Sequence, residues 1–411
     1  MKKNKSVLII TERFYPEEFG INDLALAWRA KGFEVAVLTQ LPSYPFDKIY
    51  DGYTNKLFQK EKWEGIKIYR VCSLMGYRKN VFLKVLNYLW FAFLASFTVL
   101  FIGRKYDAIF VYQVGPLTQA IPAMIAKTFF QIKMYLWTLD IWPDTVYAYG
   151  FKRGKFSAKL LNWFVGLVYR NCETVFISCR GFKEKIQCYA PNACIVFAPQ
   201  WAPSEMNFRD IRSQRCFHEG FNFTFAGNIG KVQNLENVIR VFCLAQRRYR
   251  DMNLNIIGDG SHLECLKDIA SKEKVQNVFF WGRQPLKEMP QWFEESDALI
   301  ISLVDKPIFS LTVPAKFQAY LASRKPIFCV MRGETASLVK DYNIGLIADP
   351  ADENAIQSGF ENFFNLPQEK AREFKKNMHI LLEKEFDHDK VIQRMTKKIF
   401  DVFAAEEGAS S

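Results

Sequence analysis

The sequence predicts an α/β protein built from two doubly wound domains in tandem. Short aliphatic and β-branched segments alternate with helical patterns, which is typical of parallel sheets covered by helices. This alternation begins near residue 7 and starts again near residue 221. A chain of 411 residues is also too long for one ordinary hydrophobic core and has the length of two domains.

The first half contains six predicted strands separated by helical patterns such as residues 22–32 (NDLALAWRAKG). Its lysine-rich start is like that of a signal peptide, but the apolar segment VLII that follows is too short for one. We therefore expect a buried strand there. The six predicted strands are residues 7–11, 34–39, 108–113, 134–140, 174–178 and 194–199.

The second half repeats the pattern after a predicted linker at residues 198–210 (APQWAPSEMNFRD), where prolines and polar residues follow a strand. We place the first domain at 1–200 and the second at 201–385. A last helix at about 386–404 has apolar residues at helical spacing and needs a surface that buries them. The six predicted strands of this half are 221–227, 253–258, 277–282, 298–303, 326–330 and 344–349.

Charge and cysteine content limit the classes of function. Residues 1–200 contain 27 Lys and Arg against 14 Asp and Glu, whereas residues 201–411 contain 28 against 29. A basic half suits nucleic acid, an anionic membrane surface or a phosphorylated substrate, and charge alone does not choose among them. Nine scattered cysteines without a C-x-x-C pair indicate reduced thiols in the cytoplasm, and four scattered histidines show no metal-ligand spacing, so we expect no metal.

Residues 85–103 form a segment of nineteen residues without a charge. Three interpretations are open: a membrane span, a helix buried in the domain, or a helix that lies in the membrane interface. Polar residues within the segment and basic residues on both flanks argue against a span. Its aromatic residues and the neighbouring lysines favour monotopic association with one leaflet, and residues 159–170 (KLLNWFVGLVYR) could lie there too.

A candidate anion site follows the first strand of the second half. Gly227, Asn228 and Gly230 form a tight turn that contains Lys231, and a helix is expected to begin near Asn234. Backbone N–H groups, Asn234 and one lysine would then face the diphosphate of a donor. The alternative is an ordinary turn with a solvated lysine.

Neighbouring strands of the same predicted sheet end in similar residues. Gly258 follows one strand, and Arg283 and Gln284 follow the next. Ligands of doubly wound folds bind at the carboxyl ends of the strands, so these residues are expected at one site. The chain has no G-x-G-x-x-G after its first strand and no G-K-[ST], which argues against a standard dinucleotide fold and a P-loop.

A further loop completes the predicted donor site. Ser310 and Thr312 precede Pro314, which is expected in the first turn of a helix. Free N–H groups of that turn and Lys316 would then point at the same ligand.

Two segments of the first half are candidates for an acceptor site. In RFYPEEFGINDLALAW, Glu17 and Gly20 precede a helix expected to be capped by Asn22 or by the next residue, and a plain cap is the simpler interpretation. In WTLDIWPDTVYAYG, Asp140 follows a central strand and Trp142 lies two residues later. Catalytic groups collect at such strand exits, so we interpret Asp140 as functional.

These segments together resemble a family 4 retaining glycosyltransferase. The likeness is strongest to bacterial amino-sugar transferases of the L-fucosamine type, which build O-antigen and capsule repeats. Order and spacing, more than any single motif, carry the resemblance. It spans nearly the whole chain and rests on residues 10–53, 136–151, 225–239, 278–303 and 308–327.

The resemblance implies the GT-B fold, two Rossmann-like domains facing an interdomain cleft. The second domain would bind a nucleotide sugar, with UDP favoured, and the first an acceptor, with the last helix packed back on the first domain. The turn at 227–231 would bind the diphosphate, Arg283 and Gln284 the base, and residues 310–316 the sugar and ribose. Asp140 matches the Asp of a His-Asp pair in which Leu139 replaces the histidine.

The sequence also departs from the family. Two glutamates that members commonly carry eight residues apart are Leu311 and Ala319 here, with Gln318 adjacent, and Asn228 replaces an arginine. These departures leave the ribose contact and the donor open. One alternative is therefore a catalytically weak nucleotide-sugar-binding or scaffold protein, and another is a GT-B epimerase of sugar nucleotides.

The expected chemistry is transfer without a metal. Lys231, Lys316 and two helix N-termini would stabilise the leaving diphosphate, and Asp140 would position the acceptor rather than attack. The basic, apolar first half favours a polyprenyl-diphosphate saccharide at the inner leaflet as acceptor. Nucleic acid is the least favoured partner, because it explains the charge but not the glycines at the strand exits.

Overall fold

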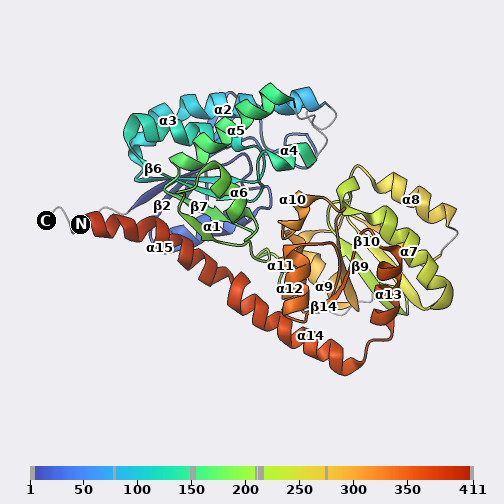
Figure 1. Cartoon of the computed structure of the whole chain (residues 1–411). Coiled ribbons are helices and arrows are strands. Elements are labelled where there is room, and N and C mark those ends of the chain that lie inside the picture. The colour runs from blue at the N-terminus through green and yellow to red at the C-terminus, as the bar shows by residue number, and fades with distance from the viewer. Residues whose placement is uncertain are drawn as a thin grey trace. The chain divides into compact units, whose positions relative to one another are not determined.

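The computed structural model describes residues 5–76, 80–148, 154–208, 211, 217–273 and 276–407. The chain forms two compact units, and each is described by itself (Figure 1). The first comprises Met1–Pro199 with Asp389–Ser411, and the second comprises Gln200–His388. Each unit has a mostly parallel sheet flanked by helices, so the predicted fold class of two doubly wound domains is confirmed.

The first unit contains an eight-stranded sheet in the order β3-β4-β2-β1-β5-β6-β7-β8. All neighbouring pairs are parallel except β3 and β4. The strand order reverses between β1 and β5, so the loops after these two strands diverge at that point of the edge. The strands are β1 Ser6–Ile10, β2 Glu34–Gln40, β3 Phe58–Trp63, β4 Ile66–Val71, β5 Ala108–Gln113, β6 Lys133–Thr138, β7 Thr174–Ile177 and β8 Ile195–Phe197.

The β3–β4 hairpin was not predicted from the sequence. Its turn places Glu64 and Gly65 at positive φ (46° and 73°), as two-residue hairpin turns require. β3 (FQKEKW) has an aromatic residue at each end and polar or charged residues between them, and none of its side chains is buried. Charged residues on an edge strand prevent it from pairing with strands of other chains. Because such a strand has no apolar pattern, it was not predicted from the sequence.

Helices cover the first sheet, and the last helix of the chain belongs to this unit (Figure 1). Trp28 Nε1 donates to Thr396 Oγ1 (2.9 Å), Lys5 Nζ donates to the Phe400 carbonyl oxygen (2.9 Å), and Phe33 stacks on Phe400. The helices are α1 Gly20–Ala30, α2 Val81–Ile102, η1 Gly103–Lys105, η2 Leu117–Ala120, α3 Ile121–Phe130, α4 Asp144–Ala148, α5 Lys155–Asn171, α6 Phe182–Tyr189 and α15 His388–Glu407.

The second unit contains a six-stranded, fully parallel sheet in the order β11-β10-β9-β12-β13-β14. Counted from its own first strand, this is the order 3-2-1-4-5-6 of nucleotide-binding sheets, and it reverses between β9 and β12. The strands are β9 Phe221–Ala226, β10 Met252–Ile257, β11 Val278–Gly282, β12 Ala298–Ser302, β13 Ile327–Val330 and β14 Gly345–Ala348.

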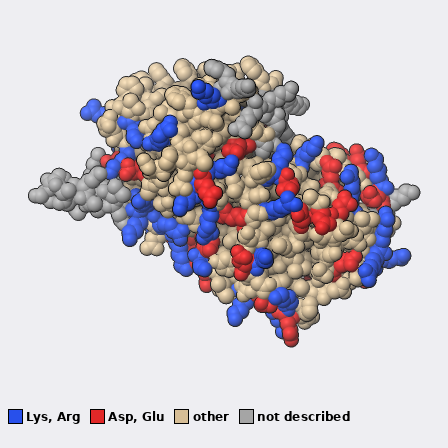
Figure 2. Space-filling view, viewed as in Figure 1, with Lys and Arg blue, Asp and Glu red and all other residues tan. Residues whose placement is uncertain are grey.

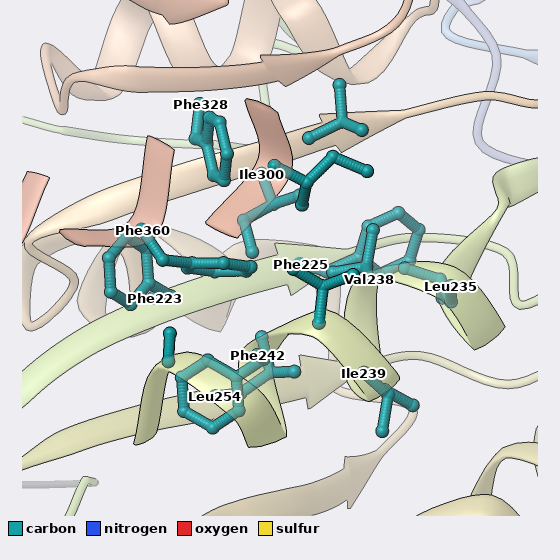
Figure 3. Close-up of a cluster of buried hydrophobic side chains, with 14 of the residues drawn as sticks. Phe223, Phe225, Leu235, Val238, Ile239, Phe242, Leu254, Ile300, Phe328 and Phe360 are labelled. Atoms are coloured by element: carbon teal, nitrogen blue, oxygen red, sulfur yellow. The ribbon is translucent and has the colours of Figure 1, made fainter. Parts of the chain in front are cut away.

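The core of the second unit lies between this sheet and helices α7 and α13 (Figure 3). Val238, Ile239 and Phe242 of α7 face Phe223 and Leu254 of the strands, and all five are buried. This apolar face fixes the start of α7 against the end of β9. The helices are η3 Lys231–Gln233, α7 Leu235–Arg248, α8 Leu263–Lys272, η4 Leu286–Glu288, α9 Met289–Glu294, α10 Pro307–Ser310, α11 Lys316–Ser323, α12 Glu334–Asp341, α13 Glu353–Phe364, α14 Gln368–Leu381 and the π-helical turn η5 Leu382–Phe386.

Candidate functional site

The loop after β9 lies where the strand order of the second unit reverses, and two glycines shape it. Gly227 and Gly258 have φ of 137° and 140°, which L side chains rarely adopt. A Cβ atom at residue 258 would lie 1.9 Å from the carbonyl oxygen of Gly227. The exits of β9 and β10 therefore approach each other as closely as backbone allows.

Backbone hydrogen bonds connect this loop to both neighbouring strand exits. Ile229 N donates to the Asp259 carbonyl oxygen (2.9 Å) on the β10 side, and Val304 N donates to the Val232 carbonyl oxygen (2.9 Å) on the β12 side. The glycine loop, which we define as residues 227–231, is thus held from both directions. Its Gly227 and Asn228 are exposed and accessible to a ligand.

Lys316, the first residue of α11, brings a cation to this loop. Its Nζ donates to Gln233 Oε1 (3.1 Å) and lies 3.5 Å from the centre of the Phe225 ring. A Cβ atom at residue 227 would lie 3.3 Å from the same Nζ. Desolvation lowers the pKa of Lys316 well below its usual value, and no acidic side chain of the described residues forms an ion pair with it. The arrangement favours an anionic ligand that would restore the charge.

The other loop residues take different positions. Lys231 is exposed in η3, beside Gly230. Asn234, predicted to contact the donor, adopts the left-handed conformation at the N-cap of α7 and donates through Nδ2 to the Pro350 carbonyl oxygen (3.3 Å). Its amide therefore ties the loop to the exit of β14.

Residues 310–316 depart from the prediction at Pro314, which lies two residues before α11 rather than in its first turn. The chain instead forms the short helix α10, which ends at Ser310. The Ser310 carbonyl oxygen would be 1.9 Å from a Cβ atom at residue 333, which is a glycine with φ of 86°. Thr335 Oγ1 donates to the Thr312 carbonyl oxygen (3.0 Å), so the exit of β13 holds this loop, and Leu311 is partly buried within it.

The predicted base-contacting residues follow β11. Gly258 N donates to the Gly282 carbonyl oxygen (2.8 Å), which places Arg283 and Gln284 next to the β10 exit. Arg283 is exposed. Gln284 is partly buried and donates through Nε2 to the Trp281 carbonyl oxygen (2.7 Å), which leaves its Oε1 for a ligand.

In the first unit, Asp140 lies two residues after β6, at the sheet edge where it was predicted. Its carbonyl oxygen accepts hydrogen bonds from Thr138 Oγ1 (2.9 Å) and Gln113 Nε2 (3.1 Å), which fixes the backbone. Burial raises the pKa of its carboxyl group to about 6. Trp142 is partly buried in the loop that leads to α4.

The segment around Glu17 is braced internally, and the predicted helix cap is wrong. Helix α1 begins at Gly20, and its N-cap residue Phe19 makes no side-chain cap bond. Asn22 lies inside the first turn and bonds backward, because its Nδ2 donates to the Glu17 carbonyl oxygen (2.8 Å) and its Oδ1 accepts from Tyr15 N (3.1 Å).

Glu17 itself is only 2% exposed, and its carboxylate is engaged by the protein. Its Oε1 accepts from Ser43 N (2.9 Å), Tyr44 N (2.7 Å) and Arg13 Nη1 (3.0 Å). Glu17 therefore anchors the loop after β2.

Glu12 is a candidate that sequence reasoning missed. It follows β1 at the point where the first sheet reverses its order, is buried, and its Oε1 has no partner. Gln119 accepts the Glu12 backbone N–H through Oε1 (3.2 Å), and its own Nε2 is unpartnered. Burial raises the pKa of Glu12 to about 8, partly offset by Arg13 and Lys84. The signal available in the sequence was an acid directly after a central strand.

Part of the chain is similar to a known protein family. Residues 207–379 match the family described as Glycosyl transferases group 1. The chain is 25% identical over 260 residues to the probable glycosyltransferase WbjE of Pseudomonas aeruginosa, a match that covers 57% of this chain and 62% of that protein. It is 23% identical to the putative colanic acid biosynthesis glycosyl transferase WcaI of Escherichia coli K12, over 96% of this chain and 99% of that one.

Solved structures share the architecture of the whole chain. Sucrose-phosphate synthase of Thermosynechococcus elongatus superposes with a TM-score of 0.74 at 13% identity, over 98% of this chain and 100% of that chain. HepE of Anabaena, solved in complex with UDP and glucose, superposes with a TM-score of 0.66 at 12% identity, over 96% and 99%. At such identities these likenesses establish the fold alone.

Proposed function

We propose that this chain, which has the GT-B fold and whose residues 207–379 match the group 1 glycosyltransferase family, is a retaining enzyme of bacterial surface polysaccharide synthesis. It would transfer a sugar, in our proposal an N-acetylated amino sugar, from a UDP-sugar to a polyprenyl-diphosphate-linked saccharide. The observation that carries the proposal is Lys316, a desolvated lysine held against the glycine loop at the switch point of the second sheet.

The donor proposal follows from the charge at that loop. A nucleotide diphosphate would accept hydrogen bonds from the exposed backbone of the loop and supply the negative charge that Lys316 lacks. The complex of HepE with UDP and glucose supports UDP as the nucleotide. Arg283 and Gln284 would meet the base, and residues 310–312 the sugar and ribose.

The chemical step needs negative charge to be stabilised on the departing diphosphate as the sugar becomes cationic. Lys316, Lys231 and the amides of the glycine loop are the groups positioned for this. Two acids at the same edge, Asp305 and Asp349, already share a cationic partner, because both pair with the single Arg332 (2.5 and 2.6 Å). We therefore propose that transfer requires no divalent cation as a cofactor.

Association with the inner face of the membrane is proposed from helix α2. Its apolar residues form two stripes, and one stripe (Phe91, Leu94, Ala95, Val99 and Ile102) is buried in the first unit. The other stripe is exposed over the whole length of the helix and contains Phe82, Leu86, Leu89, Phe93, Phe97 and Phe101, of which the last three are 60 to 69% exposed. Water is a poor solvent for a surface of this kind.

The exposed stripe continues on neighbouring helices. α2 packs on α3, which packs on α5, and these carry exposed Phe129, Leu160 and Trp163. Figure 2 shows a broad area with few charged residues over this part of the first unit, and those within it and at its upper border are basic. An aromatic, uncharged face bordered by cations is suited to an anionic membrane interface.

Helix α2 is long and apolar enough to cross a membrane by length and composition, but its packing supports a position on the surface. Asn87, at the amino-terminal end of its buried side, accepts from Leu74 N (2.8 Å) and donates to Gln40 Oε1 (3.3 Å). A spanning helix would have to give up these hydrogen bonds and its contacts with α3 and the sheet.

Flotation with vesicles tests the membrane proposal. The wild-type chain should float with vesicles that contain phosphatidylglycerol, and the triple variant Phe93→Ser, Phe97→Ser, Phe101→Ser should lose most of this binding. A matched control replaces three exposed apolar residues of the second unit, Leu244, Ile347 and Ile380, with serine. Equal loss of binding in both variants would show that the α2 stripe is not the membrane contact.

The transferase proposal is tested by binding and then by turnover. In a thermal-shift panel of nucleotides and nucleotide sugars, a UDP-sugar should raise the melting temperature, because a ligand that binds only the native state stabilises it. Transfer of labelled sugar from that donor to a lipid extract should follow. Binding without transfer or hydrolysis would favour the scaffold alternative, conversion of the free sugar nucleotide would favour an epimerase, and the absence of any nucleotide shift would refute the site.

A further inference from the structure

A second cluster of chemically reactive side chains lies in the second unit, outside the proposed donor contacts. Glu236, His262 and Cys265 each offer one ligand atom, and these atoms all lie within 4.8 Å of one another. Glu236 and His262 are partly buried and Cys265 is exposed, so the cluster is open to solutes. Twenty-six residues separate the acid from the histidine in the sequence, so spacing alone could not reveal the cluster.

Local structure explains why the three meet. His262 is the N-cap of α8 and Cys265 lies three residues later in its first turn, so both side chains lie on one face of the helix. The start of α8 is fixed, because His262 N donates to the Ile229 carbonyl oxygen (3.1 Å) and Leu263 N to the Gly260 carbonyl oxygen (3.2 Å).

The acid reaches this face from the first turn of α7. Glu236 Oε1 contacts His262 Nε2, while its Oε2 faces Arg240 Nη2 at 3.9 Å. Two helices thus supply an imidazole nitrogen, a thiol sulfur and a carboxylate oxygen to one point.

We propose that Glu236, His262 and Cys265 bind one Zn²⁺ ion. Imidazole, thiolate and carboxylate are the three ligand types that zinc takes in proteins, at about 2.0 to 2.3 Å, and three protein ligands leave a fourth position for water. A soft thiolate excludes Mg²⁺ and Ca²⁺, which require oxygen ligands. On binding, the Cys265 thiol releases its proton to solvent as the zinc–sulfur bond forms, and the carboxylate and thiolate together balance the charge of the ion.

The ion would act on structure and not on the departing diphosphate. It would join the first turns of α7 and α8 behind the glycine loop, through the hydrogen bond from His262 N to Ile229. A crosslink between these turns would stabilise the second unit and restrict the loop. The inference does not depend on the proposed transferase activity, because metal binding is measured without substrate.

Cobalt titration tests the site directly. The full chain, first treated with a chelator that is then removed, should bind one equivalent of Co²⁺ with near-ultraviolet absorption from a cobalt–thiolate bond. Zn²⁺ should displace the cobalt and raise the melting temperature. Cys265→Ser should abolish the absorption, and His262→Gln should weaken binding at least tenfold.

Cys188→Ser is the matched control, because Cys188 is an exposed cysteine on α6 in the other unit and should not affect binding. Circular dichroism of each variant checks that it folds. Three results would overturn the proposal: no one-to-one binding at micromolar metal, an absorption that survives Cys265→Ser, or an equal loss in the Cys188 control. The first of these would leave Glu236 and His262 as an ordinary hydrogen-bonded pair.

Discussion

Replacing Lys316 with glutamine should separate activity from stability. The variant keeps a polar side chain with N–H donors but removes the cation, which donates to Gln233, from the glycine loop. If Lys316 stabilises the departing diphosphate, transfer must slow. Because the same ammonium is desolvated in the free protein, the unliganded variant should be at least as stable as the wild type.

The size of both effects follows from the surroundings of Nζ. The Lys316 ammonium contacts one neutral amide oxygen at 3.1 Å and one aromatic ring at 3.5 Å. These two contacts replace only part of the hydration that the ammonium loses on burial. Removing one preorganised charge-stabilising group costs about 2.7 to 4 kcal/mol in the barrier, so kcat should fall about 10²- to 10³-fold. Each pKa unit that a bound diphosphate restores to Lys316 adds about 1.4 kcal/mol to binding.

The sign of the pH effect is fixed by the direction of the shift. The unfolded chain holds the Lys316 proton more tightly than the folded chain, so this group lowers stability at acidic pH and its cost falls as pH rises through the folded-state pKa. A bound diphosphate raises that pKa, and nucleotide binding should therefore take up a proton above it. Calorimetry in buffers of different ionisation enthalpy measures this uptake, which Lys316→Gln should abolish.

The exposed Lys231 provides the matched control, because Lys231→Gln removes a charge from the same loop without removing a desolvated group. It should reduce kcat without stabilising the free protein. A Lys316→Gln enzyme with turnover within threefold of the wild type, or with a clearly lower melting temperature, would refute the assigned role of Lys316.

Three further predictions concern the strand exits. Gly258→Ala should lower the free energy of unfolding, measured in urea, by about 3 kcal/mol or more, because its Cβ would lie 1.9 Å from the Gly227 carbonyl oxygen. The control Gly282→Ala, which has open space around it and a φ of 66°, should lower it by only about 1 kcal/mol. Similar losses in the two variants would contradict the close approach of the strand exits. Glu12→Gln should be as stable as the wild type near pH 4 and more stable at pH 9. The reason is that the folded acid, with a pKa of about 8, keeps a proton that the unfolded chain releases near pH 4.5. Stability curves that run parallel from pH 4 to pH 9 would exclude the raised pKa of Glu12. Asp140→Asn should lower kcat/KM at least tenfold and remove an ionisation near pH 6 from the rate profile, and a profile that keeps it would assign that ionisation to another group.

Most of the architecture could be predicted because both sheets are largely parallel and their central strands are buried on both faces. β1 and β5 of the first unit and β12 of the second are buried throughout and consist almost entirely of apolar residues, and β10 is buried throughout although it contains Asn253 and Asn255. The edge strand β3 has no buried side chain, so the same reasoning missed it.

The parts of the candidate site that depend on local backbone conformation could be predicted from the sequence. The parts that depend on contacts between distant residues could not. The glycines at 227 and 258 are visible in the sequence, because positive φ at a strand exit requires them. The engagement of Asn234 by Pro350, and of Glu17 by the loop after β2, depends on partners far away in the chain. Glu12 was not predicted for a related reason. Only its burial in the folded structure distinguishes it from an acid exposed to solvent.

The return of α15 to the first unit determines the order in which the two units can be completed during synthesis. Trp28 and Phe33 cannot pack against Phe400 until the ribosome has added it, almost four hundred residues after the first strand. Residues 200–388 form a continuous unit that can fold on the emerging chain, whereas the unit that begins first closes last. A stop codon shortly after residue 388 would therefore damage the amino-terminal half of the protein, and a carboxyl-terminal tag needs a linker that leaves α15 free to dock.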